Sequence, residues 1–298
     1  MVNRREFAAA VVGAATAPAA PPQFIKGICA GIFPKAMPLE ERLKQTKNAG
    51  FDGIEVPFGE LIPLETTQEQ AKRIVDTARK SGVALVSVWA SQALASNPLN
   101  SPDPEVRARG VEVLRQAIQL AGWLECGAML IVPGRLGSGA KFQIGYQDTW
   151  DRVSAEMKKV VPDAARAKVA LTPENVWNKF LVSPLDARAF VDQFKSPWVG
   201  FHFDIGNIMQ YGYPQDWILT LGLRIKGVHA KDYKLSARAE QGRFVDLLEG
   251  DVDWQEVMAA LVKVGYRGSI SPEIGHRPED PDQLRKVSSA LDKILSLA

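Results

Sequence analysis

Short apolar segments alternate with amphipathic segments along the chain from Phe24 to the C-terminus. In the amphipathic segments, apolar residues recur at intervals of three and four, as on one face of a helix. The apolar segments are predicted to be strands: 24–33, 51–56, 83–90, 128–134, 169–175, 198–204, 224–230 and 268–273. Continuous apolar strands separated by helices indicate a parallel sheet that is covered on both faces.

Eight strand–helix units in a chain of 298 residues predict an α/β fold with one closed (β/α)8 barrel. The alternative is an open, doubly wound sheet, which would need a glycine-rich turn after its first strand. The segment CAGIFP at 29–34 contains no GxGxxG pattern, so the closed barrel is favoured. Two predicted loops, 91–103 and 233–249, are long and follow strands. They therefore belong to the rim where barrel enzymes keep their active sites, and both are candidates for lids.

The first 22 residues differ from the rest of the chain. They contain the pair Arg4-Arg5, then a run of Ala, Val and Gly, then Ala-Pro-Ala at 17–19. This is the layout of a signal peptide, and its RRxF core resembles a twin-arginine export signal. The apolar run is too short and too rich in alanine to stay in a membrane, so we expect no membrane insertion after cleavage. The chain is thus divided into a signal at 1–22 and one catalytic barrel at 23–298, with a chance basic N-terminus as the alternative.

Composition narrows the class of partner. The net charge is +2, and basic and acidic residues are interleaved without a long basic run. This pattern argues against a nucleic-acid partner. Cys29 and Cys126 lie in apolar contexts without a redox or metal spacing, which favours two buried thiols over a disulfide.

Four successive predicted strands, the fifth to the eighth, end in an ionisable side chain. These residues are Glu174, Asp204, His229 and Glu273. In a barrel, the last inward-facing residue of each strand points into the mouth, so the four side chains should converge. A carboxylate at the end of a buried strand is costly unless a cation meets it. Oxygen and nitrogen ligands of this kind suit one divalent metal ion, with manganese expected first and magnesium, cobalt or zinc as alternatives. Unrelated rim residues paired with arginines are the competing interpretation.

At these residues the chain resembles the xylose isomerase-like TIM-barrel family of sugar isomerases and epimerases, which includes the ketose 3-epimerases. The resemblance covers nearly everything after the signal and is densest in PENVWNKFLVSP, FHFDIGN, VHAKDY, DLLEGDVDW and PEIG. It implies a small-molecule sugar substrate and one divalent metal held by the four residues above. It also implies that Glu174 and Glu273 act as the catalytic acid–base pair. Oligomeric state stays open, and a homo-oligomer is compatible with it.

The chemistry of such a site agrees with an epimerase. A metal chelated by a ketone and its neighbouring hydroxyl would polarise the carbonyl and stabilise an enediolate. Two glutamates on opposite sides of the sugar could remove a proton from one face and return it on the other, inverting that carbon. One base moving a proton between two carbons would instead give an aldose–ketose isomerase. Expulsion of a leaving group would give a lyase or dehydratase, for instance on an oxidised glycoside.

One residue departs from the family pattern. Several ketose epimerases carry a histidine three residues after the strand-6 aspartate, where this chain has Asn207. Asparagine can hydrogen-bond a substrate hydroxyl but cannot exchange a proton near neutral pH. The family assignment stands, since a DxGN pattern also occurs among its sugar-phosphate members, but the substrate is put in doubt.

Further side chains near the predicted mouth are candidate substrate contacts. They are Glu55, Trp89, Trp177, Asn178, Asn207, Lys231 and Arg277. Glu55 can alternatively orient a metal ligand, and the aromatic residues can simply pack the barrel. His202 is expected to be a core histidine, Asp232 to brace a loop and Asp253 to cap a helix.

Rival functions remain. A DNA-repair endonuclease on this fold would need many histidines, whereas this chain has three. An exported sugar-binding protein on a degenerate barrel is the non-enzyme alternative, and four intact ligands argue against it. Export would place the protein in the periplasm or outside the cell, where free sugars or glycosides are favoured over phosphorylated ones. A signal that does not function would leave it in the cytoplasm, and the basic residues after the last two strands leave a phosphate open.

Overall fold

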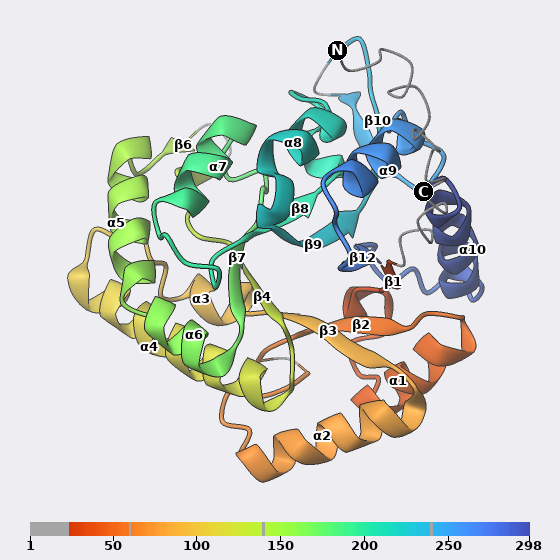
Figure 1. The fold of residues 1–298 in the computed structure, drawn as a ribbon, viewed down its shortest axis with the longest axis horizontal. Coiled ribbons are helices and arrows are strands. Elements are labelled where there is room, and N and C mark those ends of the chain that lie inside the picture. The colour runs from red at the N-terminus through yellow and green to blue at the C-terminus, as the bar shows by residue number, and fades with distance from the viewer. Residues whose placement is uncertain (1–23, 60, 139–140, 239–240) are drawn as a thin grey trace, which may run out of the picture.

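The computed structural model describes residues 24–59, 61–138, 141–238 and 241–298, so the predicted signal at 1–22 lies outside the described residues. Figure 1 shows strands at the centre and helices around them. The central strands are β1 (Ile25–Lys26), β2 (Gly53–Pro57), β3 (Ala84–Trp89), β4 (Ala128–Ile131), β7 (Ala170–Pro173), β8 (Phe201–Asp204), β9 (Ile225–Ala230) and β12 (Ser269–Pro272). Seven of them lie within a predicted segment, and β2 extends one residue beyond the predicted segment 51–56.

The eight strands form a closed parallel barrel. Hydrogen-bonded neighbours run β2-β3-β4-β7 in one half and β1-β12-β9-β8 in the other. Single parallel bridges join the halves: Cys29–Glu55 on one side, Leu171–Val199 and Glu174–His202 on the other. Most residues of these strands are buried and most are apolar, as expected for a parallel sheet that is covered on both faces. The predicted (β/α)8 barrel is therefore confirmed.

Helices surround the barrel (Figure 1). They are α1 (Leu39–Asn48), α2 (Gln68–Ser81), α3 (Ser91–Ala95), α4 (Pro104–Trp123), α5 (Tyr146–Lys158), α6 (Val161–Ala167), α7 (Pro184–Asp192), α8 (Pro214–Leu221), α9 (Trp254–Lys263) and α10 (Gln283–Leu295), with 3-10 turns at Ala30–Ile32, Gly206–Ile208 and Gly222–Arg224. The side chain of Asp253 accepts the N–H of Glu256 and so caps α9. Gly82 ends α2 with φ of +68°, a conformation that suits a residue without Cβ. None of the described helices is long and apolar enough to cross a membrane.

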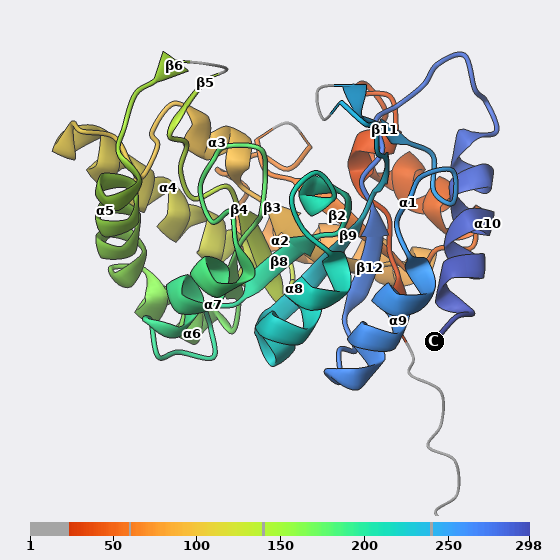
Figure 2. The ribbon, with the colours of Figure 1, turned by 90° about the horizontal axis from the view of Figure 1, so that it is seen from above.

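The predicted long loops contain regular structure. Helix α3 occupies the first, and an antiparallel pair, β10 (Asp232–Lys234) with β11 (Arg243–Val245), occupies much of the second. Another antiparallel pair, β5 (Gly137–Ser138) with β6 (Lys141–Phe142), follows β4. Figure 2 shows α3, β5, β6 and β11 at one end of the barrel. These short elements build the rim around the carboxyl ends of the strands.

A histidine lies in the barrel interior one layer below the rim. His202 is 1% exposed, and neither ring nitrogen has a hydrogen-bond partner among the described residues. Its ring meets the ring of His229 nearly edge-on, with centroids 4.1 Å apart. Gly227 leaves room for it, because a Cβ there would lie 2.5 Å from His202 Nδ1. Burial lowers the pKa of His202 well below its usual value, so the ring is a neutral packing element beneath the site.

Candidate active site

The four residues that end the fifth to eighth strands lie together at the rim. One ligand atom from each of Glu174, Asp204, His229 and Glu273 can be chosen so that all lie within 4.8 Å of one another. His229 Nδ1 is 3.0 Å from Glu174 Oε1, 3.3 Å from Glu273 Oε2 and 3.8 Å from Asp204 Oδ2. The first three side chains are almost fully buried, while that of Glu273 is 43% exposed. The group therefore opens to the outside on the side of Glu273.

A divalent cation fits this arrangement. Three carboxylates face one imidazole nitrogen, so the group carries more negative than positive charge without a metal ion. Asp204 Oδ2 is buried and receives no hydrogen bond of good geometry from the described residues. Buried carboxylate oxygens in native proteins are usually hydrogen-bonded or bound to a metal. The donor set and the position of this buried oxygen are both compatible with one bound ion.

Lysine 231 supplies the nearest positive charge. Its Nζ lies 2.9 Å from Asp204 Oδ2 and also forms an ion pair with Glu273. Burial alone would lower the pKa of Lys231, but the neighbouring carboxylates raise it above its usual value, so the ammonium is retained. Lys231 thus reaches the metal-ligand group itself and lies over the ring of Phe244, 5.5 Å from its centroid.

The two glutamates of the group differ in their electrostatic environment. Burial raises the pKa of Glu174 to about 7, and the hydrogen bond with His229 opposes that rise. Burial also acts on Glu273, but His229 and Lys231 outweigh it and hold its pKa below the usual value. One carboxyl group is therefore adapted to take up a proton and the other to stay ionised.

Hydrogen bonds between side chains and backbone groups hold the ends of β7 and β8 in position. The side chain of Asn175 accepts the N–H of Asp204 at 2.9 Å and donates to the carbonyl of Asp204 at 2.8 Å. Asn207 donates its backbone N–H to Asp204 Oδ1 and its side-chain amide to the carbonyl of Asn175. These bonds fix the positions of Glu174 and Asp204. Because its backbone N–H and its side-chain NH₂ are engaged in this way, Asn207 braces the ligands.

The other candidate substrate contacts lie in different environments. Trp177 is 51% exposed, donates its indole N–H to the carbonyl of Asn207 and stacks on Phe244 with centroids 5.1 Å apart. Asn178 is buried and bonds the carbonyl of Gly134 and the N–H of Phe180, so it supports the loop. Trp89 is partly buried against the core.

A cleft of about 660 Å³ adjoins the metal-ligand group, and its lining includes Lys231, Arg243, Phe244, Glu273 and Arg277. Arg277 binds the carboxylate of Asp246 through both terminal nitrogens, at 2.8 and 3.1 Å. The cleft therefore presents cationic side chains beside carboxylates, since Asp246, Glu249 and Glu273 line it as well. A polar ligand with an anionic or hydroxyl-rich end would fit it.

Glu55 lies behind the site. Its side chain is fully buried, and its Oε1 is 2.8 Å from His229 Nε2, on the edge of the ring opposite the other carboxylates. This position excludes the sugar contact that the sequence suggested and agrees with the alternative that Glu55 orients a ligand. Nothing in the sequence pattern distinguished these two roles, because both require an acid at the end of β2.

Asp232 joins the rim insertion to the barrel. It is 1% exposed, and its carboxylate accepts the N–H groups of Tyr233, Leu248 and Val252 and the indole N–H of Trp254, at 2.9 to 3.3 Å. These bonds tie β10 to the start of α9. The predicted loop brace therefore lies where the sequence suggested.

Replacing Asp232 with Asn should lower the free energy of unfolding by about 2–4 kcal/mol. The side-chain NH₂ of asparagine would face N–H groups that are bound to a charged acceptor in the wild type. Urea unfolding followed by circular dichroism measures the change. Asp251→Asn is the matched control, since Asp251 is an exposed partner of Lys234 on the same loop and should matter much less. Equal losses for the two variants would contradict the bracing role of Asp232.

Comparison with known proteins identifies a family and relatives that match most of this chain. The family model described as xylose isomerase-like TIM barrel matches residues 43–294. The chain is 32% identical to the L-ribulose-5-phosphate 3-epimerase UlaE of Escherichia coli O1:K1 over 266 residues, which cover 86% of this chain and 90% of that protein.

Solved structures show the same fold. D-psicose 3-epimerase of Clostridium cellulolyticum H10 aligns with a TM-score of 0.74 at 18% identity, covering 92% of this chain and 99% of that one. The 3-keto-D-glucoside 4-epimerase YcjR of E. coli aligns with a TM-score of 0.73 at 14% identity, covering 92% and 100%. At these identities, the structures support the barrel and nothing more specific.

Proposed function

This chain belongs to the xylose isomerase-like TIM barrel family, and we propose that it is a metal-dependent sugar epimerase that inverts the carbon next to a ketose carbonyl. The observation that carries the proposal is the convergence of three carboxylates and one imidazole at the barrel mouth, in a chain whose curated relative is named an epimerase. The enzyme class follows from that kinship, and the metal and the roles of individual residues are part of the proposal.

The proposed ligands are Glu174, Asp204, His229 and Glu273, and manganese is the first expectation for the ion. A divalent cation bound there would polarise the ketone of the sugar and stabilise the negative charge that develops beside it. Glu174 and Glu273 both lie close to His229 Nδ1, at 3.0 and 3.3 Å. One of them removes the proton from the neighbouring carbon, which leaves an enediolate, and the other returns a proton to the opposite face. The configuration of that carbon is thereby inverted.

Three further side chains would bind the substrate. Lys231 presents an ammonium to the space between Asp204 and Glu273, where it can donate to a sugar oxygen. The exposed indole of Trp177, held by its bond to Asn207, offers an aromatic face at the mouth for the apolar face of a sugar. Arg277 lies in the same cleft and can meet an anionic substituent.

The proposal includes export by a twin-arginine-type route, on the basis of the sequence of residues 1–22. In an exported enzyme, free ketoses and glycosides are the expected substrates. The named relative acts on a phosphorylated sugar, and Arg243 or Arg277 in the cleft could bind a phosphate group as well. Both classes therefore belong in the assay.

The test is to load the protein with manganese and supply free and phosphorylated ketoses in deuterium oxide. Proton and carbon NMR should show deuterium entering beside the carbonyl together with inversion at that carbon. Formation of an aldose would indicate an isomerase, and loss of a substituent would indicate a lyase. Binding without any exchange across the panel would overturn the proposal in favour of a sugar-binding protein.

A further inference from the structure

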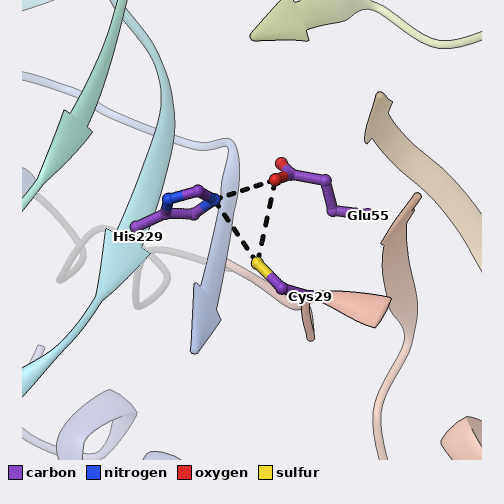
Figure 3. A group of neighbouring side chains, drawn as sticks. All are labelled: Cys29, Glu55 and His229. Carbon is purple, nitrogen blue, oxygen red and sulfur yellow. Dashed lines mark hydrogen bonds and ion pairs between the residues drawn. The ribbon is translucent and has the colours of Figure 1, made fainter. Parts of the chain in front are cut away.

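A second buried group lies on the inner edge of the His229 ring. Figure 3 shows Cys29, Glu55 and His229 meeting at one point, with the other ring nitrogen of His229 on the far edge. Their exposed fractions are 2%, 0% and 3%. Cys29 follows β1, Glu55 lies in β2 and His229 in β9, so three different strands bring the group together.

The two ring nitrogens of His229 have different surroundings. Nδ1 faces the group of Glu174, Asp204 and Glu273. Nε2 lies 2.8 Å from Glu55 Oε1 and 3.4 Å from Cys29 Sγ. A neutral imidazole has one N–H donor and one lone-pair acceptor, whereas an ionised carboxylate only accepts. Nδ1 is also close to a carboxylate oxygen, 3.0 Å from Glu174 Oε1, so without a metal ion both ring nitrogens can donate a hydrogen. A cation bound to Nδ1 would need the lone pair there, and the hydrogen on Nε2 would then be the one donated to Glu55.

Glu55 is itself held rigidly. Its second oxygen accepts the hydroxyl of Ser87 on the neighbouring strand β3. Its backbone N–H donates to the carbonyl of Ile28 at 2.9 Å, and its strand forms a bridge with Cys29. Cys29 Sγ lies 3.7 Å from Glu55 Oε1 and closes the remaining side. A carboxylate with so little freedom can fix both the tautomer and the orientation of the imidazole that it contacts.

We propose that Glu55 is a positioning residue that holds His229 as the Nε2–H tautomer, with Nδ1 ready to bind the divalent cation. The inference rests on the proposed metal site, and it assigns Glu55 a role distinct from the substrate contacts. Cys29 contributes packing and a weak hydrogen bond rather than a metal bond. The catalytic residues remain Glu174 and Glu273.

The tautomer can be measured without metal or substrate. The chain has three histidines, so protein labelled with 15N-histidine gives few signals, and His276→Gln and His202→Gln assign them. Long-range proton–nitrogen correlation in metal-free protein should show a hydrogen on Nε2 of His229, alone or together with one on Nδ1. In Glu55→Leu the hydrogen on Nε2 should be lost, and in Glu55→Gln, which retains an acceptor oxygen, it should persist. A wild-type ring that carries hydrogen on Nδ1 alone would overturn the proposal.

Metal affinity gives the second readout. Manganese binding measured by calorimetry should weaken about 10-fold in Glu55→Gln and up to about 100-fold in Glu55→Leu. Cys29→Ser should bind like the control Cys126→Ser, which removes the other buried thiol. Unchanged affinity in both Glu55 variants, with folding verified by circular dichroism, would contradict the assignment.

The same variants separate this inference from two other outcomes. Cys29, Glu55 and His229 are close enough to hold a cation of their own. An intense thiolate-to-cobalt absorption in the Co²⁺-loaded protein that disappears in Cys29→Ser would show that second site and overturn the proposal. Wild-type protein with an Nε2–H tautomer but no uptake of any divalent metal would refute the proposed function and leave the Glu55–His229 pairing supported.

Discussion

Replacing Glu174 with Gln is expected to lower the turnover number by about 10²–10⁴-fold, the range typical for removal of a general acid or base. Glutamine keeps the size of the side chain and an oxygen that can approach the metal, but it cannot accept the proton. Because the two side chains have the same size, this substitution at the buried position beside His229 should leave the fold intact. Steady-state kinetics on the manganese-loaded enzyme measure the loss, and Glu256→Gln, an exposed change on α9, is the control.

Glu273→Gln should lose inversion to a similar extent, and isotope exchange distinguishes the two variants. With one base left, a variant can still remove and return a proton on one face of the substrate. Each variant should therefore exchange deuterium into one epimer only, and the preferred epimer should differ between them. Turnover within tenfold of the wild type in either variant would exclude the proposed acid–base pair.

Removing divalent metal with a chelator should abolish activity and lower the melting temperature by about 5–10 °C. Without the ion, the positive charges paired with these three carboxylates in the described part of the chain come from Lys231 and His229. Saturation at a hundredfold excess over the Kd stabilises a folded protein by about 2.7 kcal/mol, and each kcal/mol shifts the melting temperature of a domain of this size by about 2–4 °C. Differential scanning fluorimetry and elemental analysis of the same samples measure the two effects.

Asp204→Asn is the matched variant for this experiment. It removes the carboxylate whose Oδ2 has no well-formed hydrogen bond, so its melting temperature should no longer respond to manganese. Full activity in wild-type protein that elemental analysis shows to be metal-free would rule out metal dependence. Restoration by added manganese is the expected reversal.

The barrel could be predicted because its signals are local and repeated. Each apolar run that ends at a residue such as Glu174 or Asp204 is followed by a helical pattern, and eight repeats leave one closed topology. The convergence of the four strand ends follows from that topology, since carboxyl ends of parallel strands meet at one rim. The start of α9 at Asp253 followed from ordinary capping preferences.

Other features of the structure could not be predicted from local sequence patterns. The β10–β11 pair lies in a polar segment without alternating hydrophobicity, and its place depends on the contacts of Asp232 across the rim insertion. The bracing roles of Asn178 and Asn207 depend on which backbone groups the fold brings near them. The position of Glu55 behind His229, rather than facing the mouth, depends on the tilt of β2 against β9. Sequence spacing does not encode such distances.

The first strand has a consequence for biosynthesis. β1 gains its parallel partner only when Ser269 and Ile270 are in place, and Glu273 follows directly after them. A nascent chain on the ribosome therefore carries an unclosed sheet with exposed edges until residues 269 and 270 have emerged. Glu273 is the last of the four ligands to emerge, so the complete ligand set is expected to capture a metal ion only at the point where the barrel also closes.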